Sequence, residues 1–349
     1  MAEFRLGPAT VGDTHPAYVI AEAGANHNRD FDVARRLIDV AADAGANAVK
    51  FQTYSGATLY STKTPRFDYL GELGALPAHE LLESIALPRD WQAPLSQHAS
   101  DRGIEFLSSP FDRQAVDELD ALDVAAFKIA SFEIVDHGLL AYAASKGRPV
   151  ILSTGMCTLA EVDEAIAVLR SNGCGAVALL QCASMYPAPA HIMNLRSIAA
   201  MRSAFDVPVG LSDHTTGIHI ASAAVAMGAT LIEKHFTLDR SMSGPDHPFA
   251  IEPKELAEMV AQIRDVEAAL GDGVKRGPSA EESAEMYSKA RRSLVAACTI
   301  PAGTKITESM LCVKRPGYGI APRMREAVLG RVAQCDIEYD EILTWDLVA

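Results

Sequence analysis

Paired cysteines and long apolar runs are both missing from this chain of 349 residues. The six cysteines are dispersed and none forms a Cys-x-x-Cys pair, so the sequence indicates neither a disulfide framework nor a cysteine-ligated zinc site. No apolar run approaches the length of a membrane span, and the N-terminus lacks the basic and then apolar order of a secretory signal. We therefore expect a soluble cytoplasmic protein whose cysteines are small buried apolar side chains.

Positive charge is also scarce. The 31 lysines and arginines against 45 aspartates and glutamates give a net charge of −14 at pH 7, which argues against nucleic acid and against an anionic membrane surface as partners. An acidic substrate would have to be held by a local cluster of lysines or dipoles. With 49% hydrophobic residues, the chain can build a core for one large barrel plus a small module, or for two medium domains.

Short apolar runs alternate with helical stretches over the first 270 residues. After a hairpin at 4–12, we count eight strands, the first at 18–22, each followed by a helix, the last at 253–270. This number and order predict an α/β fold, the (β/α)8 TIM barrel, in which the carboxyl ends of the strands form the active face. The segment 53–88 is too long for an ordinary connection, and we interpret it as a lid.

Two histidines are placed alike within this pattern. His214 and His235 each close a short apolar run, and the helical stretch 217–228 between them makes the unit βαβ with neighbouring parallel strands. Both imidazoles can then reach one point, where they would form a divalent-metal site with positions left open for substrate. A single histidine of this kind is more often a structural residue, but the matched positions favour a metal site.

Polar residues follow the other predicted strands as well, so they gather on the same face of the barrel. Lys50 and Lys128 come directly after apolar strand residues, which solubility alone does not explain. The candidates at the strand ends are Glu22, Lys50, Gln52, Ser109, Lys128, Ser131, Glu133, Ser153, Ser184, Tyr186, Ser212, His214 and His235.

The region after the barrel has a different character. We place a glycine-, proline- and charge-rich linker at 272–290, between a barrel domain at 1–271 and a small β-rich module at 291–349. A module of about sixty residues is thin for independent stability, so we expect it to dock on another surface. Its turn Lys314-Arg315-Pro316-Gly317 presents the guanidinium of Arg315.

Several motifs in this order resemble those of a known family. The chain resembles the sialic acid synthases, more broadly the nonulosonate synthases, over nearly its whole length. Its C-terminal module is similar to their antifreeze-like SAF domain, a β-clip fold. The motifs are Glu22-x-Gly-x-Asn-His27, Lys50-x-Gln52-Thr53, Ser109-Pro110-Phe111, Phe127-Lys128-Ile129-Ala130-Ser131, Leu152-Ser153-Thr154-Gly155-Met156, Gly210-Leu211-Ser212-Asp213-His214, Glu233-Lys234-His235-Phe236 and Gly244-Pro245-Asp246.

The resemblance implies condensation of phosphoenolpyruvate with an N-acetylmannosamine-type sugar, giving a nine-carbon 2-keto acid and phosphate. It also implies Mn²⁺, with Mg²⁺ or Co²⁺ as alternatives, on His214 and His235, where the metal polarises the open-chain aldehyde. The residues that the resemblance assigns to phosphoenolpyruvate are Lys50, Ser109, Lys128, Ser131, Ser153 and Ser212. Those that it assigns to the sugar are Gln52, Tyr186, Asp246 and Arg315.

Two further roles follow from the resemblance. After the carbon–carbon bond forms, the enol ether carbon becomes cation-like, water adds there, and a carboxylate takes the proton of that water. Glu22 and Glu133 both match this role, and the sequence leaves the choice open. In the family, the arginine matching Arg315 reaches into the partner subunit's barrel and contacts the N-acetyl group of the sugar. The resemblance therefore implies a domain-exchanged homodimer.

One departure keeps the product open. Phe132 stands where neuraminate-type enzymes usually carry glycine and is similar to pseudaminate- and spore-coat-type relatives, whereas Gly244-Pro245-Asp246 and Ser153-Thr154-Gly155-Met156 resemble the neuraminate type. Pseudaminate-, legionaminate- and spore-coat-type synthases are therefore alternatives. A more distant alternative is another barrel enzyme, such as a metal-dependent aldolase or a 3-deoxy-sugar-acid phosphate synthase, and the attached β module argues against it. The remaining alternative is a non-catalytic sugar-binding barrel, which the presence of both histidines, both lysines and both glutamates disfavours.

Overall fold

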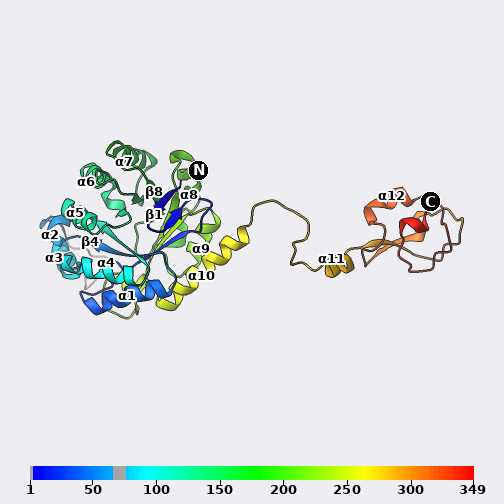
Figure 1. Ribbon diagram of the computed structural model, residues 1–349, viewed down its shortest axis with the longest axis horizontal. Helices are drawn as coiled ribbons and strands as arrows, with labels where there is room; N and C mark the ends of the chain where they lie inside the picture. The colour runs from blue at the N-terminus through cyan, green and yellow to red at the C-terminus, as the bar shows by residue number, and fades with distance from the viewer. Residues whose placement is uncertain (1–2, 66–75) are drawn as a thin grey trace. The chain divides into compact units, whose positions relative to one another are not determined.

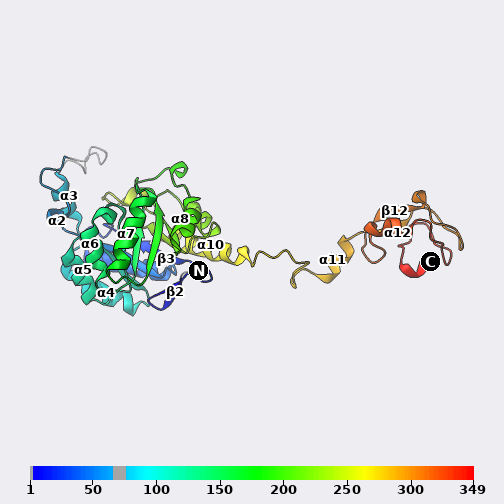
Figure 2. The same cartoon turned by 90° about the horizontal axis from the view of Figure 1, so that it is seen from above.

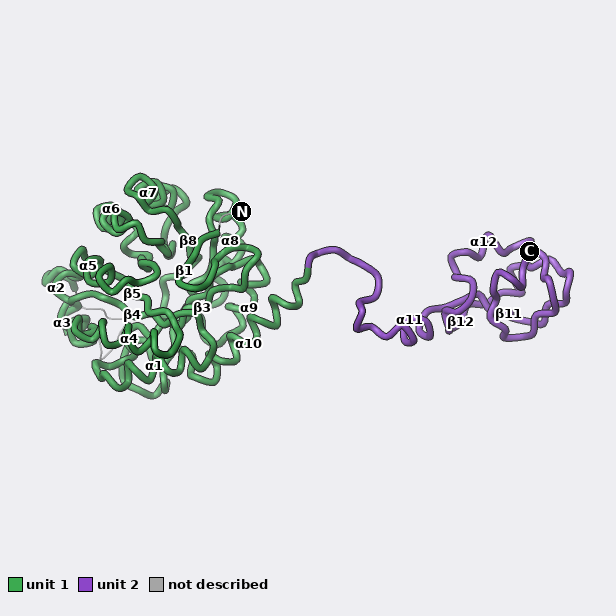
Figure 3. Tube along the Cα trace, viewed as in Figure 1, with its two compact units in different colours: residues 1–271 green, residues 272–349 purple. Residues whose placement is uncertain are grey.

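The computed structural model describes residues 3–65 and 76–349 and divides the chain into two compact units, Met1–Gly271 and Asp272–Ala349 (Figures 1 and 3). Each unit has a buried apolar cluster of its own. Over the described ranges, no helix combines the length and the apolar character that crossing a bilayer requires.

The first unit is built on eight parallel strands. They run in the order β5-β4-β3-β10-β9-β8-β7-β6, and β5 and β6 at the two ends of this order lie side by side, so the sheet is nearly closed. The predicted TIM-like barrel is confirmed. The strands are β3 (Tyr18–Glu22), β4 (Ala48–Thr53), β5 (Glu105–Pro110), β6 (Phe127–Ile129), β7 (Val150–Ser153), β8 (Val177–Cys182), β9 (Val209–Asp213) and β10 (Leu231–His235).

Helices surround this sheet (Figures 1 and 2). They follow the strands in chain order. One of them begins with a capping box, in which the Thr158 hydroxyl accepts from the Glu161 amide and the Glu161 carboxylate accepts from the Thr158 amide. The helices are α1 (Phe31–Asp43), α4 (Gln92–Asp101), α5 (Arg113–Ala121), α6 (His137–Ala144), α7 (Leu159–Ser171), α8 (Ser197–Phe205), α9 (His219–Ala226) and α10 (Pro253–Leu270).

Alternation along the strands divides the core into two layers. In β3, Val19 and Ala21 belong to the apolar layer between sheet and helices, whereas Tyr18 and Ile20 belong to the cluster inside the barrel. Glu22 follows in the inward series and comes at the carboxyl end of the strand. The same alternation places the inward polar residues of the other strands at this end.

The predicted N-terminal hairpin also forms, and it contributes to the barrel interior. Strands β1 (Phe4–Leu6) and β2 (Ala9–Val11) pair antiparallel. Leu6 and Val11 are fully buried in the same cluster as Tyr18 and Leu231, the first residues of their strands. The hairpin therefore packs at the amino ends of the strands, opposite the polar residues.

The segment interpreted as a lid contains two short helices, α2 (Gly56–Leu59) and α3 (Ala78–Ile85). They touch: a Cβ on Gly56 would lie 1.9 Å from the carbonyl oxygen of His79, and Glu83 accepts a hydrogen bond of 2.8 Å from the Gly56 amide. Residues 66–75 of the predicted lid lie outside the described part of the chain.

The second unit is a small β-rich fold. Strands β11 (Ser293–Ala296) and β12 (Leu311–Lys314) pair antiparallel, and isolated bridges such as Ile300 to Ile337 extend the pairing. Its core gathers Leu294, Ile300, Ile306, Leu311, Ile320, Val328, Ala333, Ile337, Leu343 and Val348. Helix α12 (Arg325–Val328) lies within this fold, and α11 (Ala284–Ala290) falls inside the expected linker.

Candidate active site

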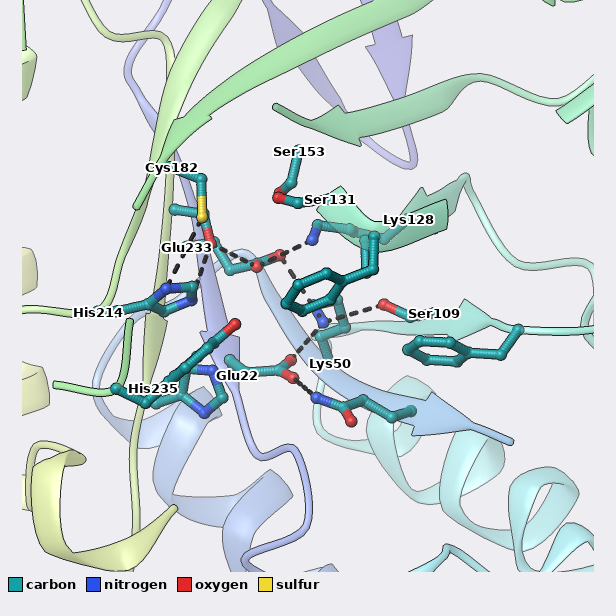
Figure 4. Close-up of a pocket in the computed structure, with 16 residues that line it drawn as sticks. Glu22, Lys50, Ser109, Lys128, Ser131, Ser153, Cys182, His214, Glu233 and His235 are labelled. Atoms are coloured by element: carbon teal, nitrogen blue, oxygen red, sulfur yellow. Dashed lines mark hydrogen bonds and ion pairs between the residues drawn. The ribbon is translucent and has the colours of Figure 1, made fainter. Parts of the chain in front are cut away.

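A pocket lies at the carboxyl ends of the barrel strands (Figure 4). Most residues that the sequence predicts for the site line it, namely Glu22, Lys50, Gln52, Ser109, Lys128, Ser131, Ser153, Tyr186, Ser212, His214 and His235. The pocket also has lining residues that the sequence did not predict for the site, namely Phe111, Ala130, Phe132, Cys182 and Glu233.

Lys50 lies deep in this pocket among carboxylates. Its Nζ is 2.7 Å from Oε2 of Glu22 and 3.8 Å from Oε2 of Glu233, and it donates a hydrogen bond of 3.2 Å to the hydroxyl of Ser109. Burial acts against the charged amine, but the two carboxylates raise the pKa of Lys50 above its usual value. Lys50 is therefore a buried cation.

Glu233 is the most important site residue that sequence reasoning missed. Its Oε1 lies 3.3 Å from Nζ of Lys128 and accepts a hydrogen bond of 3.0 Å from Ser212. Burial opposes ionisation, yet Lys128 and Lys50 lower the pKa of Glu233, so it is an anion between two cations. The signal was available: Glu233 comes two residues before His235 in β10, so alternation puts both side chains on the inner face.

Hydroxyl groups surround an open space beside the lysines. The hydroxyl of Ser131 accepts a hydrogen bond of 2.9 Å from the amide of Gly155. A Cβ on Gly155 would lie 2.4 Å from the hydroxyl of Ser184 and 2.9 Å from that of Ser131, so a larger residue here would displace these hydroxyls. The hydroxyl of Ser153 is buried without a hydrogen-bond partner in the described residues. Buried hydroxyls next to ammonium groups are the donors that phosphate or carboxylate oxygens require.

The two histidines meet as the sequence predicts. Their ring centroids are 5.4 Å apart, with the rings inclined by 62°. Nδ1 of His214 lies 2.8 Å from the carbonyl oxygen of Ala183; because a carbonyl only accepts, Nδ1 carries the proton and Nε2 keeps its lone pair. Nδ1 of His235 is buried without a hydrogen-bond partner in the described chain.

The electrostatics of the histidines fit a metal site. Burial lowers the pKa of His214 to about 4 and that of His235 well below its usual value, so both imidazoles are neutral. Neutral imidazole is the form that binds divalent transition metals, and a carbonyl on the other ring nitrogen is the common support. Within residues 3–65 and 76–349, no group of three or more His, Cys, Asp or Glu side chains is arranged to hold a metal.

The residues expected to bind the sugar are placed differently from one another. The amide of Gln52 donates a hydrogen bond of 2.8 Å to Oε1 of Glu22. The ring of Tyr186 packs on His214 with centroids 4.2 Å apart, and it is 44% exposed at the mouth of the pocket. Asp246 does not line the pocket; its Oδ2 lies 3.6 Å from Nδ1 of His235.

Arg315 belongs to the second unit. Its side chain is exposed and makes no ion pair or side-chain hydrogen bond with the described residues. The turn that carries it is fixed by backbone contacts, because Gly317 donates to the carbonyl of Ser288 at 2.7 Å and Ser293 donates to that of Pro316 at 2.8 Å.

The structure separates the two candidate bases. Burial raises the pKa of Glu22 and of Glu133 to about 7 in each case. Glu22 lines the pocket, whereas Glu133 lies in the 3-10 helix Ser131–Val135 and does not. Only Glu22 is in contact with Lys50.

Comparisons with known proteins agree with one another. The NeuB family model matches residues 37–275, and the SAF domain model matches residues 291–349. The N,N'-diacetyllegionaminic acid synthase of Campylobacter jejuni is 43% identical over 93% of this chain and 98% of that protein. The N-acetylneuraminate-9-phosphate synthase of Homo sapiens is 36% identical over 99% of this chain and 97% of that protein. A crystal structure of N-acetylneuraminic acid synthetase from Leptospira borgpetersenii, in complex with citrate, has a TM-score of 0.72 and 36% identity, covering 82% of this chain and 95% of that chain.

Proposed function

Because the chain belongs to the NeuB family of nonulosonate synthases, we propose that it condenses phosphoenolpyruvate with an N-acetylmannosamine-type sugar. The products are a nine-carbon 2-keto acid and phosphate. The observation that carries this proposal is the pocket itself, in which two buried lysines, buried hydroxyls and two neutral imidazoles converge at the active end of the barrel. We expect the reaction to take place in the cytoplasm.

Phosphoenolpyruvate is the substrate for the deep part of the pocket. Lys50 and Lys128 supply the positive charge that a compact trianion needs in a protein of net charge −14. Ser109 accepts a hydrogen bond from Lys50, and Ser131 and Ser153 lie on the side of Lys128 (Figure 4). Ser212 donates to the oxygen of Glu233 that lies 3.3 Å from Nζ of Lys128. This arrangement supports binding of the phosphate and the carboxylate of phosphoenolpyruvate by different lysines, one by Lys50 and the other by Lys128.

His214 and His235 are the residues that would hold a divalent cation. Bound there, Mn²⁺, or Mg²⁺ or Co²⁺, would supply a Lewis acid for the aldehyde of the open-chain sugar. The chain keeps both imidazoles neutral by burial and fixes the ring of His214 through the carbonyl of Ala183. Tyr186, which packs on that ring, forms the outer wall against which the sugar lies.

Glu22 is the proposed base. The CH2 carbon of phosphoenolpyruvate attacks the aldehyde carbon and forms the new carbon–carbon bond, and the aldehyde oxygen takes up a proton to become a hydroxyl. Water then adds at the adjacent carbon, which bears the phosphate oxygen, and the bond between that carbon and the phosphate oxygen breaks, which leaves the 2-keto group and releases phosphate. Glu22 takes the proton of that water, because it lines the pocket and its pKa of about 7 suits proton transfer near neutral pH. Gln52, which donates to Oε1 of Glu22, holds the carboxylate in place.

The acceptor sugar decides which nonulosonate forms. N-Acetylmannosamine, giving N-acetylneuraminate, is the first candidate. The 43% identity to a diacetyllegionaminic acid synthase supports a diacetamido sugar as the alternative, and a pseudaminate- or spore-coat-type product is a further one. Phe132, 53% exposed in the pocket wall, would face the substituents that differ among these sugars.

The proposed assembly is a domain-exchanged homodimer in which Arg315 completes the partner's site. Its support is the exposed guanidinium on a fixed turn, which has no ion-pair partner among the described residues of its own chain. A small module buries little apolar surface by itself and gains stability by docking on a second barrel.

Phosphate release tests the proposal directly. Purified enzyme is incubated with phosphoenolpyruvate, Mn²⁺ and each member of a panel of N-acetylated hexosamines, with phosphate and 2-keto acid measured together. We expect both products in equal amounts with at least one acceptor and neither without a sugar. A metal-dependent aldolase would release no phosphate from phosphoenolpyruvate, and a non-catalytic sugar-binding barrel would give neither product.

A further inference from the structure

A buried ion pair lies directly behind the two histidines. Asp213 and Lys234 are register partners in β9 and β10, and each immediately precedes a histidine in the chain, His214 and His235 respectively. Nζ of Lys234 lies 2.8 Å from Oδ2 of Asp213, and both side chains are at most 1% exposed. Alternation along the strands turns this pair away from the pocket, and neither residue lines it.

The pair also holds the turn that follows β9. Lys234 donates a second hydrogen bond of 2.6 Å to the carbonyl oxygen of Thr215. The other oxygen of Asp213 accepts from the amide of Thr215 at 2.9 Å and from its hydroxyl at 2.7 Å. Lys234 therefore contacts both Asp213 and Thr215, the residues on either side of His214. Lys234 itself directly precedes His235 in the chain.

Stability alone does not account for this arrangement. Two buried charges carry a desolvation penalty that apolar residues of the same size avoid. The ion pair constrains the geometry of the two strand ends, because hydrogen bonds fix distances and angles in a way that apolar contacts do not. A shared metal site needs such fixing, since its donors must be held within about 0.5 Å of their working positions.

We propose that Asp213 and Lys234 form a positioning pair that sets the separation of the His214 and His235 imidazoles and so the affinity of the site for a divalent cation. Thr215 is its third member, because it ties the pair to the turn beyond His214. The inference rests on the proposed function, which assigns the cation to these two histidines.

Mn²⁺ affinity tests the pair without recourse to activity. Metal-free enzyme is titrated with Mn²⁺, and the free ion is followed by electron paramagnetic resonance. The control is Arg148→Met, which breaks ion pairs to Asp120 (2.7 Å) and Asp123 (2.8 Å) just before the amino end of β7. Lys234→Met should weaken Mn²⁺ binding about 10- to 100-fold, the usual loss when an outer partner of metal ligands is removed.

Two further variants cover the case in which Lys234→Met does not fold, since it leaves the carboxylate of Asp213 buried without its ion-pair partner. Thr215→Val should weaken binding by a smaller factor. The double variant Asp213→Leu/Lys234→Met leaves no unpaired buried charge, so it should fold and still bind Mn²⁺ weakly. Arg148→Met should lower the melting temperature and leave the Mn²⁺ affinity unchanged.

The variant His214→Ala distinguishes a failure of the metal assignment from a failure of the positioning role. If the wild type binds Mn²⁺ and His214→Ala does not, the metal assignment stands, and wild-type affinity in the folded pair variants overturns the positioning role alone. If the wild type and His214→Ala bind Mn²⁺ alike, or neither binds it, the metal assignment and the positioning role are both wrong.

Discussion

Oε1 of Glu233 lies 3.3 Å from Nζ of Lys128, and its other oxygen lies 3.8 Å from Nζ of Lys50. One buried carboxylate thus separates the two cations that the proposal assigns to phosphoenolpyruvate. Without it the ammonium groups would repel each other, and one of them would lose its proton more readily.

Glu233→Gln should therefore weaken phosphoenolpyruvate binding. We expect its KM to rise about tenfold or more, equivalent to at least about 1.4 kcal/mol, with a much smaller change in the KM of the sugar. Steady-state kinetics with each substrate varied in turn measures this. Asp117→Asn, at an exposed ion pair with Lys146, is the control. A larger effect on the sugar than on phosphoenolpyruvate would contradict the role of Glu233.

Lys50→Met and Lys128→Met should each act on the same substrate. Charged hydrogen bonds to a trianion are lost, so we expect the KM of phosphoenolpyruvate to rise about 10- to 100-fold, in line with about 1.5–3 kcal/mol per bond to a charged group. The KM of the sugar should change far less. Equal effects on the two substrates would count against the assignment of the lysines.

His214→Ala and His235→Ala should each abolish activity and leave the fold intact. Both rings lie at the carboxyl ends of strands, where truncation leaves the apolar layers of the barrel unchanged. Activity, near-ultraviolet circular dichroism and bound Mn²⁺ measured on the same preparations check this. A crystal soaked in Mn²⁺ that places the ion away from these rings would show that the metal assignment is wrong.

Mixing two inactive variants tests the action of Arg315 in trans. Arg315→Ala and His214→Ala are incubated under conditions that let subunits exchange. A mixed domain-exchanged dimer carries one site without either residue and one complete site, so activity should reappear, up to about half per mixed dimer. If exchange is verified by mass and activity stays absent, Arg315 acts within its own chain or has no part in the reaction.

Glu133 should make stability depend on pH. Burial raises the pKa of Glu133 to about 7, although Lys128 acts in the opposite direction. Because this pKa lies above that of the unfolded chain, the ionised carboxylate destabilises the fold above about pH 7, and the penalty disappears as the pH falls toward about 4.5.

The variant Glu133→Gln, which cannot ionise, should therefore raise the melting temperature at pH 8 and change it little at pH 5. We expect a rise of a few degrees, since 1 kcal/mol corresponds to roughly 2–4 °C in a domain of this size. Glu164→Gln, at an exposed position of α7, is the control. An equal shift at both pH values would mean that ionisation of Glu133 is not its cause.

The repeating pattern of the barrel could be predicted from the sequence because each strand and helix carries its own periodicity. The meeting of His214 and His235 followed from the same pattern, since a crossover helix makes their strands neighbours. Local periodicity does not place loops. Asp246 lies near His235 because of the course of the loop after β10. Glu133 does not line the pocket because a 3-10 helix begins at Ser131. Neither segment has a periodic sequence pattern from which its course could be predicted.

The N-terminal hairpin has a kinetic consequence. Leu6 and Val11 fill the amino end of the barrel with apolar side chains, so among the described residues the pocket lies at the opposite end of the barrel, with Tyr186 in its lining. Lys50 lies at the inner end, 3% exposed, and Tyr186 at the mouth, 44% exposed. If phosphoenolpyruvate binds at Lys50 and the sugar at Tyr186, as proposed, the anion lies deeper than the sugar, and we expect an ordered mechanism in which phosphoenolpyruvate binds first.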